Sequence, residues 1–163
     1  MTAQDIVVHS FSPPQHPTPS RYLKEAREGD FFLQHAVFGT GETLATLRLH
    51  YRTLGSPHRN ADGRIDNAVL ILHGTGDSSL SMLTDVFAEP LFGPHAPLDI
   101  AKYYIVLPDD IGHGQSSKPS DGLHARFPHY DYDDMVQTQH RMLEEGLGID
   151  HLRLVLGLSL IHI

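Results

Sequence analysis

The sequence predicts an α/β protein with a mainly parallel sheet, and two observations support this fold class. Three candidates for buried strands, residues 68–72, 103–107 and 151–156, alternate with segments of helical character. That order is typical of parallel strands joined by right-handed crossover helices. The run at 68–72 is apolar throughout rather than at alternate positions, as in strands that are covered on both faces.

An antiparallel N-terminal hairpin is expected before these strands. Residues 31–38 and 44–51 are rich in β-favouring residues and are joined by Gly-Thr-Gly-Glu at 39–42. In the second run, Leu47 and Leu49 alternate with polar residues, which indicates one face on a core and one in water. Ahead of the hairpin, four prolines within residues 12–19 disfavour helix and central strand.

These boundaries divide the chain into three parts. Residues 1–30 are expected to form a Pro-rich, poorly ordered arm, and residues 31–157 a partial α/β domain. Helices are expected over 79–87 and over 131–146, where Asp131 can cap the N-terminus and Met135, Met142 and Leu143 form the apolar face.

Composition excludes several classes of function. The 163 residues carry 12 Lys+Arg against 20 Asp+Glu, a formal charge of -8 that does not suit a nucleic-acid partner. No apolar run approaches the roughly 20 residues of a membrane span, and the N-terminus lacks a secretory signal, so no membrane partner and a cytoplasmic location are expected. There is no Cys, and the 13 His form no metal-binding motif, so neither metal nor cofactor is expected.

The loop after the first apolar run could stabilise an oxyanion. Gly74 and Gly76 in His73-Gly74-Thr75-Gly76 allow backbone N–H groups to point into one concavity. A plain strand-to-helix turn is one alternative. Dinucleotide binding is another, with Ser79 in place of the third glycine of the fingerprint and Asp109 in place of the ribose-binding acid.

The loops after the other two runs carry more specific patterns. Residues 109–119 read D-x-x-G-H-G-x-S-x-x-P, in which an acid, glycines and a serine can hold a tight turn. We interpret these residues as structural supports, His113 included although it could serve as a base; they are Asp109, Gly112, His113, Gly114 and Ser116. After the third run, Ser159 occupies the nucleophile position of a G-x-S-x-G elbow, with Ile161 in place of the second glycine.

Taken together, residues 31–157 resemble the N-terminal half of an α/β-hydrolase-superfamily protein of the homoserine O-acetyltransferase-like group. Besides the D-x-x-G-H-G-x-S-x-x-P loop, the resemblance rests on short segments along the chain: Gly41–Leu44, Tyr51–Gly55, Asn67–Leu70, Phe127–Pro128, Asp134–Val136, Gln139 and Leu147–Ile149. It implies acyl transfer through a serine of a Ser-His-Asp triad, with small-molecule acyl esters or thioesters as partners. The triad Asp and His would follow the elbow, so the 163-residue chain itself is expected to be inactive.

The resemblance departs from the acetyltransferases proper in two loops. Those enzymes carry a longer oxyanion loop and a different glycine loop where this chain has Gly112-His113-Gly114. We therefore expect hydrolysis of a small carboxylic ester, with a homoserine O-acetyltransferase-like acyltransferase as the alternative. A non-catalytic binding protein on this fold is an alternative of another class. The acyl donor and acceptor, the cap region and the oligomeric state are not predicted.

The last six residues, Leu-Ser-Leu-Ile-His-Ile at 158–163, have a second interpretation. The codons CTG TCT CTT ATA CAC ATC would encode them, and that string resembles the mosaic end of a transposase-based sequencing adapter. On this hypothesis residues 158–163 are non-native and Ser159 occupies the nucleophile position by accident.

Overall fold

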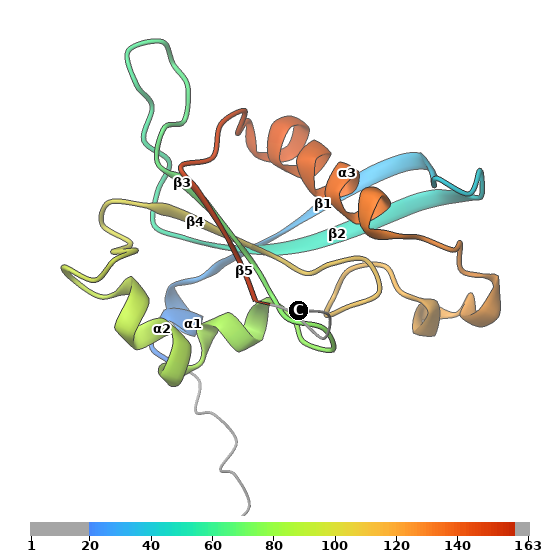
Figure 1. Ribbon diagram of the computed structural model, residues 1–163, viewed down its shortest axis with the longest axis horizontal. Coiled ribbons are helices and arrows are strands. Elements are labelled where there is room, and N and C mark those ends of the chain that lie inside the picture. The colour runs from blue at the N-terminus through green and yellow to red at the C-terminus, as the bar shows by residue number, and fades with distance from the viewer. Residues whose placement is uncertain (1–19, 159–163) are drawn as a thin grey trace, which may run out of the picture.

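A hairpin of two long strands forms one edge of a five-stranded sheet with the order β1-β2-β4-β3-β5 (Figure 1). The computed structural model describes residues 20–158. Strands β1 (Arg27–Val37) and β2 (Thr43–Leu54) pair antiparallel, with Leu33 opposite Leu47. The predicted hairpin is therefore confirmed. Its strands are longer than expected, because the end of β2 continues into a second antiparallel pairing with β4.

The other strands form the parallel part of the sheet. Strand β3 (Ala68–Leu72) pairs in parallel with both β4 (Tyr104–Pro108) and β5 (Leu154–Gly157). The first strand matches the predicted run, and the second is shifted by one residue. The third begins at residue 154 rather than 151, because β3 offers pairing only from Ala68, whose carbonyl accepts the N–H of Arg153. The predicted α/β class is confirmed.

The predicted helices are present with changed boundaries. The segment at 79–87 is a 3-10 helix, η1 (Ser79–Leu83), and then helix α2 (Asp85–Phe92), separated by the extended residue Thr84. Helix α3 (Tyr132–Arg141) continues into a π-helical segment, η4 (Met142–Gly146). As expected, Asp131 caps α3, because its carboxylate accepts from the N–H of Asp134. The carboxylate of Asp134 accepts from the N–H of Asp131, which completes a capping box. Three shorter helices complete the chain: α1 (Tyr22–Glu25), η2 (Pro119–Asp121) and η3 (His124–Arg126).

The expected poorly ordered arm is wrong for residues 20–30. Tyr22 in α1 is 2% exposed and packs edge-on against Phe92 of α2, with 5.8 Å between the ring centroids. The hydroxyl of Ser20 donates to the carbonyl of Leu83, and β1 begins at Arg27. The prolines that motivated the arm end at residue 19, so they do not restrict this segment. Residues 1–19 lie outside the described part of the chain.

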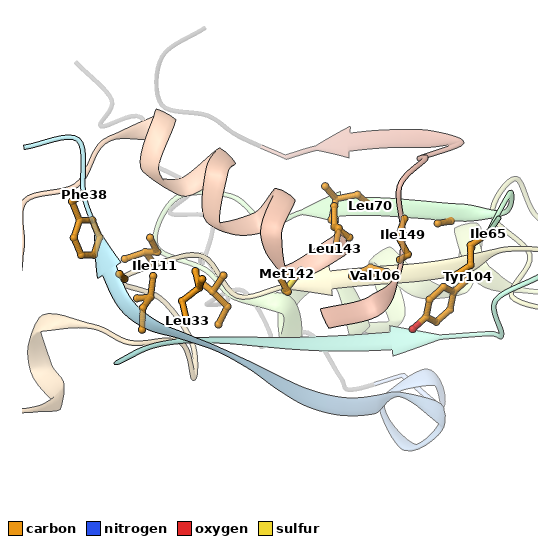
Figure 2. Packing of buried hydrophobic residues seen from close by; sticks show 14 of the residues in the cluster. Leu33, Phe38, Ile65, Leu70, Tyr104, Val106, Ile111, Met142, Leu143 and Ile149 are labelled. Carbon is orange, nitrogen blue, oxygen red and sulfur yellow. The ribbon is translucent and has the colours of Figure 1, made fainter. Parts of the chain in front are cut away.

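Apolar side chains pack on both faces of the sheet. One cluster lies beneath α3 and η4 and includes Leu33, Val106, Met142 and Leu143 (Figure 2). The other packs against α1, η1 and α2 on the opposite face, as the two helix layers in Figure 1 show. Alternate residues of β3 and β4 enter the two clusters, which explains why these strands are apolar throughout. The loops at their carboxyl ends are thereby held on a rigid support.

Candidate active site

The loops that follow β3 and β4 meet the start of α3 around one cavity. The cavity has a volume of about 450 Å³ and is lined by His73, Gly74, Thr75, Asp110, His113, Tyr130, Asp131, Tyr132 and Met135. It lies beyond the carboxyl ends of the parallel strands, where ligands bind in open α/β sheets. The structure therefore brings the predicted oxyanion loop and part of the predicted support loop to the same place.

His73 joins the two loops through its ring. Its Nδ1 lies 2.8 Å from the carbonyl oxygen of Gly74, and its Nε2 lies 3.1 Å from the backbone N of Asp110. Because the carbonyl can only accept and the N–H can only donate, we assign the neutral tautomer with the proton on Nδ1. Both ring nitrogens of this buried histidine are then satisfied. His73 holds the loops together and is not placed to act as a proton acceptor.

The glycine loop presents backbone donors to the cavity. Gly74 and Thr75 line it, whereas Gly76, with φ +80°, lies outside the lining. Within residues 20–158, the N–H groups of Gly74, Thr75 and Gly76 donate no hydrogen bond. A Cβ on Gly74 would lie 3.2 Å from the carbonyl oxygen of Leu158, so this loop adjoins the end of β5. Donors without acceptors at the mouth of a cavity are suited to stabilise a negatively charged oxygen.

Asp109 anchors the second loop from behind the cavity. Its carboxylate accepts from the N–H and hydroxyl of Ser79 at 2.7 and 2.6 Å and from the N–H of Gln115 at 2.7 Å. Burial acts to raise the Asp109 pKa, but these hydrogen bonds and the charge of Arg52 outweigh it, so the pKa is lowered. Gly114, with φ +49°, has no Cβ because one would collide with this carboxylate. The acid that dinucleotide binding would require is buried and engaged by Ser79 and Gln115, which does not favour that alternative.

The network behind Asp109 extends into the hairpin. Ser116 Oγ donates to the carbonyl oxygen of Asp109 at 2.6 Å and accepts from the N–H of His50 at 2.8 Å. Arg52 Nη1 donates to Ser79 Oγ, while Nε and Nη2 of the same guanidinium contact Glu28 at 2.9 and 2.7 Å. Side chains of β1 and β2 thus fix the loop after β4, through partners that the loop motif alone does not reveal.

Gly112 and His113 have their contacts on the cavity side of the loop rather than in this network. Gly112 has φ +86°, and a Cβ there would collide with the hydroxyl of Tyr130, so the glycine makes room for a residue of the lining. His113 itself lines the cavity, with its ring centroid 5.2 Å from that of His73 and its Nδ1 3.1 Å from the carbonyl of Ile111. Sequence reasoning treated His113 as a support, whereas the structure places it on the cavity wall.

Asp110 is a site residue that the sequence reasoning missed. It is 8% exposed, lines the cavity, and accepts a hydrogen bond through Oδ1 from Nε2 of Gln139 on α3. Burial raises the pKa of Asp110, against the influence of His73, His113 and Gln139. No sequence pattern singled it out, because Asp110 lies in the loop after β4 rather than in the strand.

The predicted nucleophile, Ser159, lies outside the described residues. The pairing of β5 with β3 continues to Leu158, whose N–H donates to the carbonyl of Leu72 at 2.9 Å. Across residues 20–158, no group of three or more His, Cys, Asp or Glu is arranged to hold a metal ion. None of the described helices is long and apolar enough to cross a membrane.

Comparison with known proteins identifies relatives of one enzyme group, although no family model matches the chain. The chain is 30% identical over 140 residues to a protein of Methanothermobacter thermautotrophicus named "Probable acyltransferase", covering 85% of this chain and 42% of that protein. It is 35% identical over 141 residues to the homoserine O-acetyltransferase of Chlorobium chlorochromatii, covering 80% and 37%. The chain thus spans about 40% of the length of such relatives.

Solved structures agree on the fold. The acetyl esterase MekB matches with a TM-score of 0.67 and 26% identity, covering 83% of this chain and 38% of that one. The homoserine O-acetyltransferase of Bacillus anthracis matches with a TM-score of 0.64 and 21% identity, covering 81% and 39%. The predicted resemblance is confirmed: the chain has part of an α/β-hydrolase fold, and its relatives are homoserine O-acetyltransferases and other acyltransferases.

Proposed function

We propose that this protein catalyses acyl transfer by a serine nucleophile and that its main reaction is hydrolysis of a small carboxylic ester. The observation that carries the proposal is the glycine loop after β3, whose Gly74 and Thr75 face the cavity while their N–H groups have no acceptor within residues 20–158. A tetrahedral intermediate needs two such donors aimed at one oxygen. The relatives, which include acyltransferases and an acetyl esterase, support the same class of reaction.

The proposed nucleophile position is that of Ser159, two residues after β5. Its Oγ would attack the ester carbonyl, and the resulting oxyanion would accept hydrogen bonds from the loop at 74–76. Collapse of the intermediate expels the alcohol, which takes up a proton, and leaves an acyl-serine. Water then attacks the acyl-serine to release the acid and regenerate the serine. The base for these steps is not His73, because main-chain groups occupy both of its ring nitrogens.

A serine-reactive fluorophosphonate probe tests this mechanism on the protein prepared at the length of its relatives. We expect one labelled serine, located by peptide mass spectrometry at position 159, and no labelling in Ser159→Ala. Ser120→Ala, a change at an exposed serine, serves as the matched control and should label like the wild type. Esterase turnover should disappear with the label. An unlabelled but folded protein would favour a non-catalytic binding protein on this fold.

Homoserine O-acetyltransferase activity is the second candidate, favoured by the names of several relatives. The two reactions differ only in the acceptor that attacks the acyl-serine, which is water for a hydrolase and the hydroxyl of homoserine for the transferase. Incubation with an acetyl ester or acetyl-CoA, with and without homoserine, separates them. Formation of O-acetylhomoserine at the expense of free acetate would identify the transferase.

A further inference from the structure

The nine described residues that line the cavity carry negative but no fixed positive side-chain charge. Two carboxylates, Asp110 and Asp131, are among its nine lining residues, and none of the nine is Lys or Arg. One of the two lining histidines, His73, is held neutral by its two main-chain contacts. A carboxylate that enters such a cavity meets like charges in a partly desolvated space, where repulsion is much stronger than in water.

Asp110 is the carboxylate with the most direct access to a ligand. Gln139 occupies Oδ1, whereas Oδ2 lies 3.8 Å from Nε2 of His73, beyond hydrogen-bond distance. Within residues 20–158, no group donates a hydrogen bond to Oδ2. Asp131 differs, because one of its oxygens accepts from the N–H of Asp134 as the cap of α3. Asp110 therefore leaves a lone-pair oxygen facing the cavity.

Two features near the cavity could attract an anion: the N-terminus of α3 and the N–H groups of the glycine loop. The N-terminus of α3 adjoins the cavity, but the carboxylates of Asp131 and Asp134 already cap it. The N–H groups of the glycine loop remain, and in the proposed reaction they are taken up by the ester carbonyl oxygen. Among the nine lining residues, no Lys or Arg is then left to balance a second negative charge on the substrate, and the imidazole of His113 already acts on Asp110 itself.

We propose that Asp110 is a specificity-determining residue that makes this cavity select neutral esters and reject substrates bearing a free carboxylate. The inference rests on the proposed acyl-transfer function and assigns its substrate class. It disfavours any substrate or acceptor whose carboxylate would lie beside Asp110. An uncharged or hydroxyl-bearing group can instead donate to Oδ2 of Asp110 or pack on Tyr130, Tyr132 and Met135.

Binding of a matched ligand pair tests this inference without requiring turnover. 4-Acetamidobenzamide and 4-acetamidobenzoate contain no ester, have nearly the same shape around a slowly reacting amide, and differ in one charge. Isothermal titration at a series of pH values gives the ratio of their dissociation constants, and this ratio should grow as the pH rises and Asp110 ionises. For the wild type at the length of its relatives, we expect the carboxylate to bind about tenfold more weakly or worse. Equal binding would overturn the inference without any variant.

Variants then assign the effect to one residue. Asp110→Asn keeps a side-chain oxygen that can accept from Gln139. In this variant the carboxylate should bind closer in strength to the neutral ligand, so that the ratio of the two dissociation constants falls at least about threefold. Asp62→Asn, at an exposed position in a distant turn, is the matched control and should leave the ratio unchanged. Asp131→Asn retains a good helix cap. If Asp131→Asn lowers the ratio of the two dissociation constants while Asp110→Asn does not, the assignment to Asp110 is overturned.

The hydrolysis of two aryl acetates separates this inference from the proposed function. The ratio of kcat/KM for 4-acetoxybenzamide and 4-acetoxybenzoate, each divided by its alkaline hydrolysis rate, should follow the binding ratio in wild type and in Asp110→Asn. Selective binding without serine labelling would contradict the serine mechanism but support the selectivity. Labelling with an unchanged ratio in Asp110→Asn would contradict the selectivity but support the mechanism.

Discussion

Asp109 and Asp110 are adjacent in the chain, yet their carboxylates have opposite surroundings. Asp109 is fully buried and accepts hydrogen bonds from two residues, Ser79 and Gln115, which together lower its pKa despite burial. Asp110 faces the cavity with a single hydrogen-bond donor, Gln139, and burial raises its pKa. Donors supplied by the protein determine which carboxylate holds the loop and which is left for a ligand.

The contrast teaches how this loop divides its two tasks. On the Asp109 side, Ser79, Gln115 and Ser116 connect the loop to η1 and to the hairpin, so changes there should act on stability. On the Asp110 side, the partners are a histidine, a glutamine and open space, so changes there should act mainly on binding. Four measurements test this division.

Asp109→Ala should lower the free energy of unfolding by about 3–5 kcal/mol. The change leaves the buried N–H groups of Ser79 and Gln115 without an acceptor and removes the charge that faces Arg52. Urea unfolding followed by circular dichroism measures the loss. Asp62→Ala, at an exposed turn, should change stability by no more than about 0.5 kcal/mol. If Asp109→Ala lowers the free energy of unfolding by as little as Asp62→Ala does, Asp109 does not stabilise the fold.

Gly114→Ala should cost about 2 kcal/mol or more, because it adds a Cβ that collides with the Asp109 carboxylate and forces alanine into positive φ. Gly63→Ala isolates the cost of placing an alanine at positive φ. Gly63 has φ +80° with nothing within 4 Å of the added Cβ, so only about 1 kcal/mol of backbone strain is expected. Equal losses in thermal or urea unfolding would mean that the contact with Asp109 contributes nothing.

The two carboxylates should affect stability in opposite directions as the pH changes. Asp109, with its lowered pKa, stabilises the fold above the ordinary Asp pKa, and this contribution is lost as the pH falls through its folded pKa. Asp110, with its raised pKa, costs stability increasingly as the pH rises from the ordinary value through its folded pKa. Relative to wild type, Asp110→Asn should therefore gain stability from acid to neutral pH and Asp109→Asn should lose it, each by on the order of 1 kcal/mol.

Urea unfolding of wild type and both asparagine variants at a series of pH values provides this comparison. Each variant is compared with wild type at the same pH, so the other titrating groups largely cancel. Two difference curves with the same slope would contradict the opposite environments of the two carboxylates.

Gln139→Ala should have the smallest effect on stability, about 1 kcal/mol, because it removes one donor from a carboxylate that remains beside the cavity. It should also raise the Asp110 pKa further and so weaken the rejection of anionic ligands near neutral pH. Gln137→Ala, on the same helix but directed away from Asp110, is a suitable control. A stability loss as large as that of Asp109→Ala would place Asp110 among the structural anchors.

The sequence predicted the strands better than the chemistry of the loops. Residues 68–72 are apolar throughout and form a strand with those bounds, because burial on both faces leaves a clear pattern. The short helix at Tyr22 was missed, because its stability comes from packing against Phe92 rather than from local preference. Asp109 and Ser116 could be predicted as loop supports from residue type, whereas their partners Ser79 and His50 depend on tertiary structure.

The candidate site was predicted in part. The glycines at 74 and 76 pointed to the loop beside the cavity, because few other residues permit so sharp a turn. Asp110 and Tyr130 gave no such signal, since an acid beside an acid and a tyrosine in a loop have no distinctive pattern. Their place in the cavity follows from how the loop and α3 pack together.

The bridge made by His73 has a consequence for how new selectivity could arise in this protein. Its imidazole links Gly74 to the backbone of Asp110, not to its side chain, so the loops stay aligned whichever residue occupies position 110. Saturation libraries at positions 110, 113, 132 and 135 should therefore yield many folded variants with altered ligand preference. A matching library at positions 79, 109 and 116 should yield few, which makes the cavity side of the loop the evolvable one.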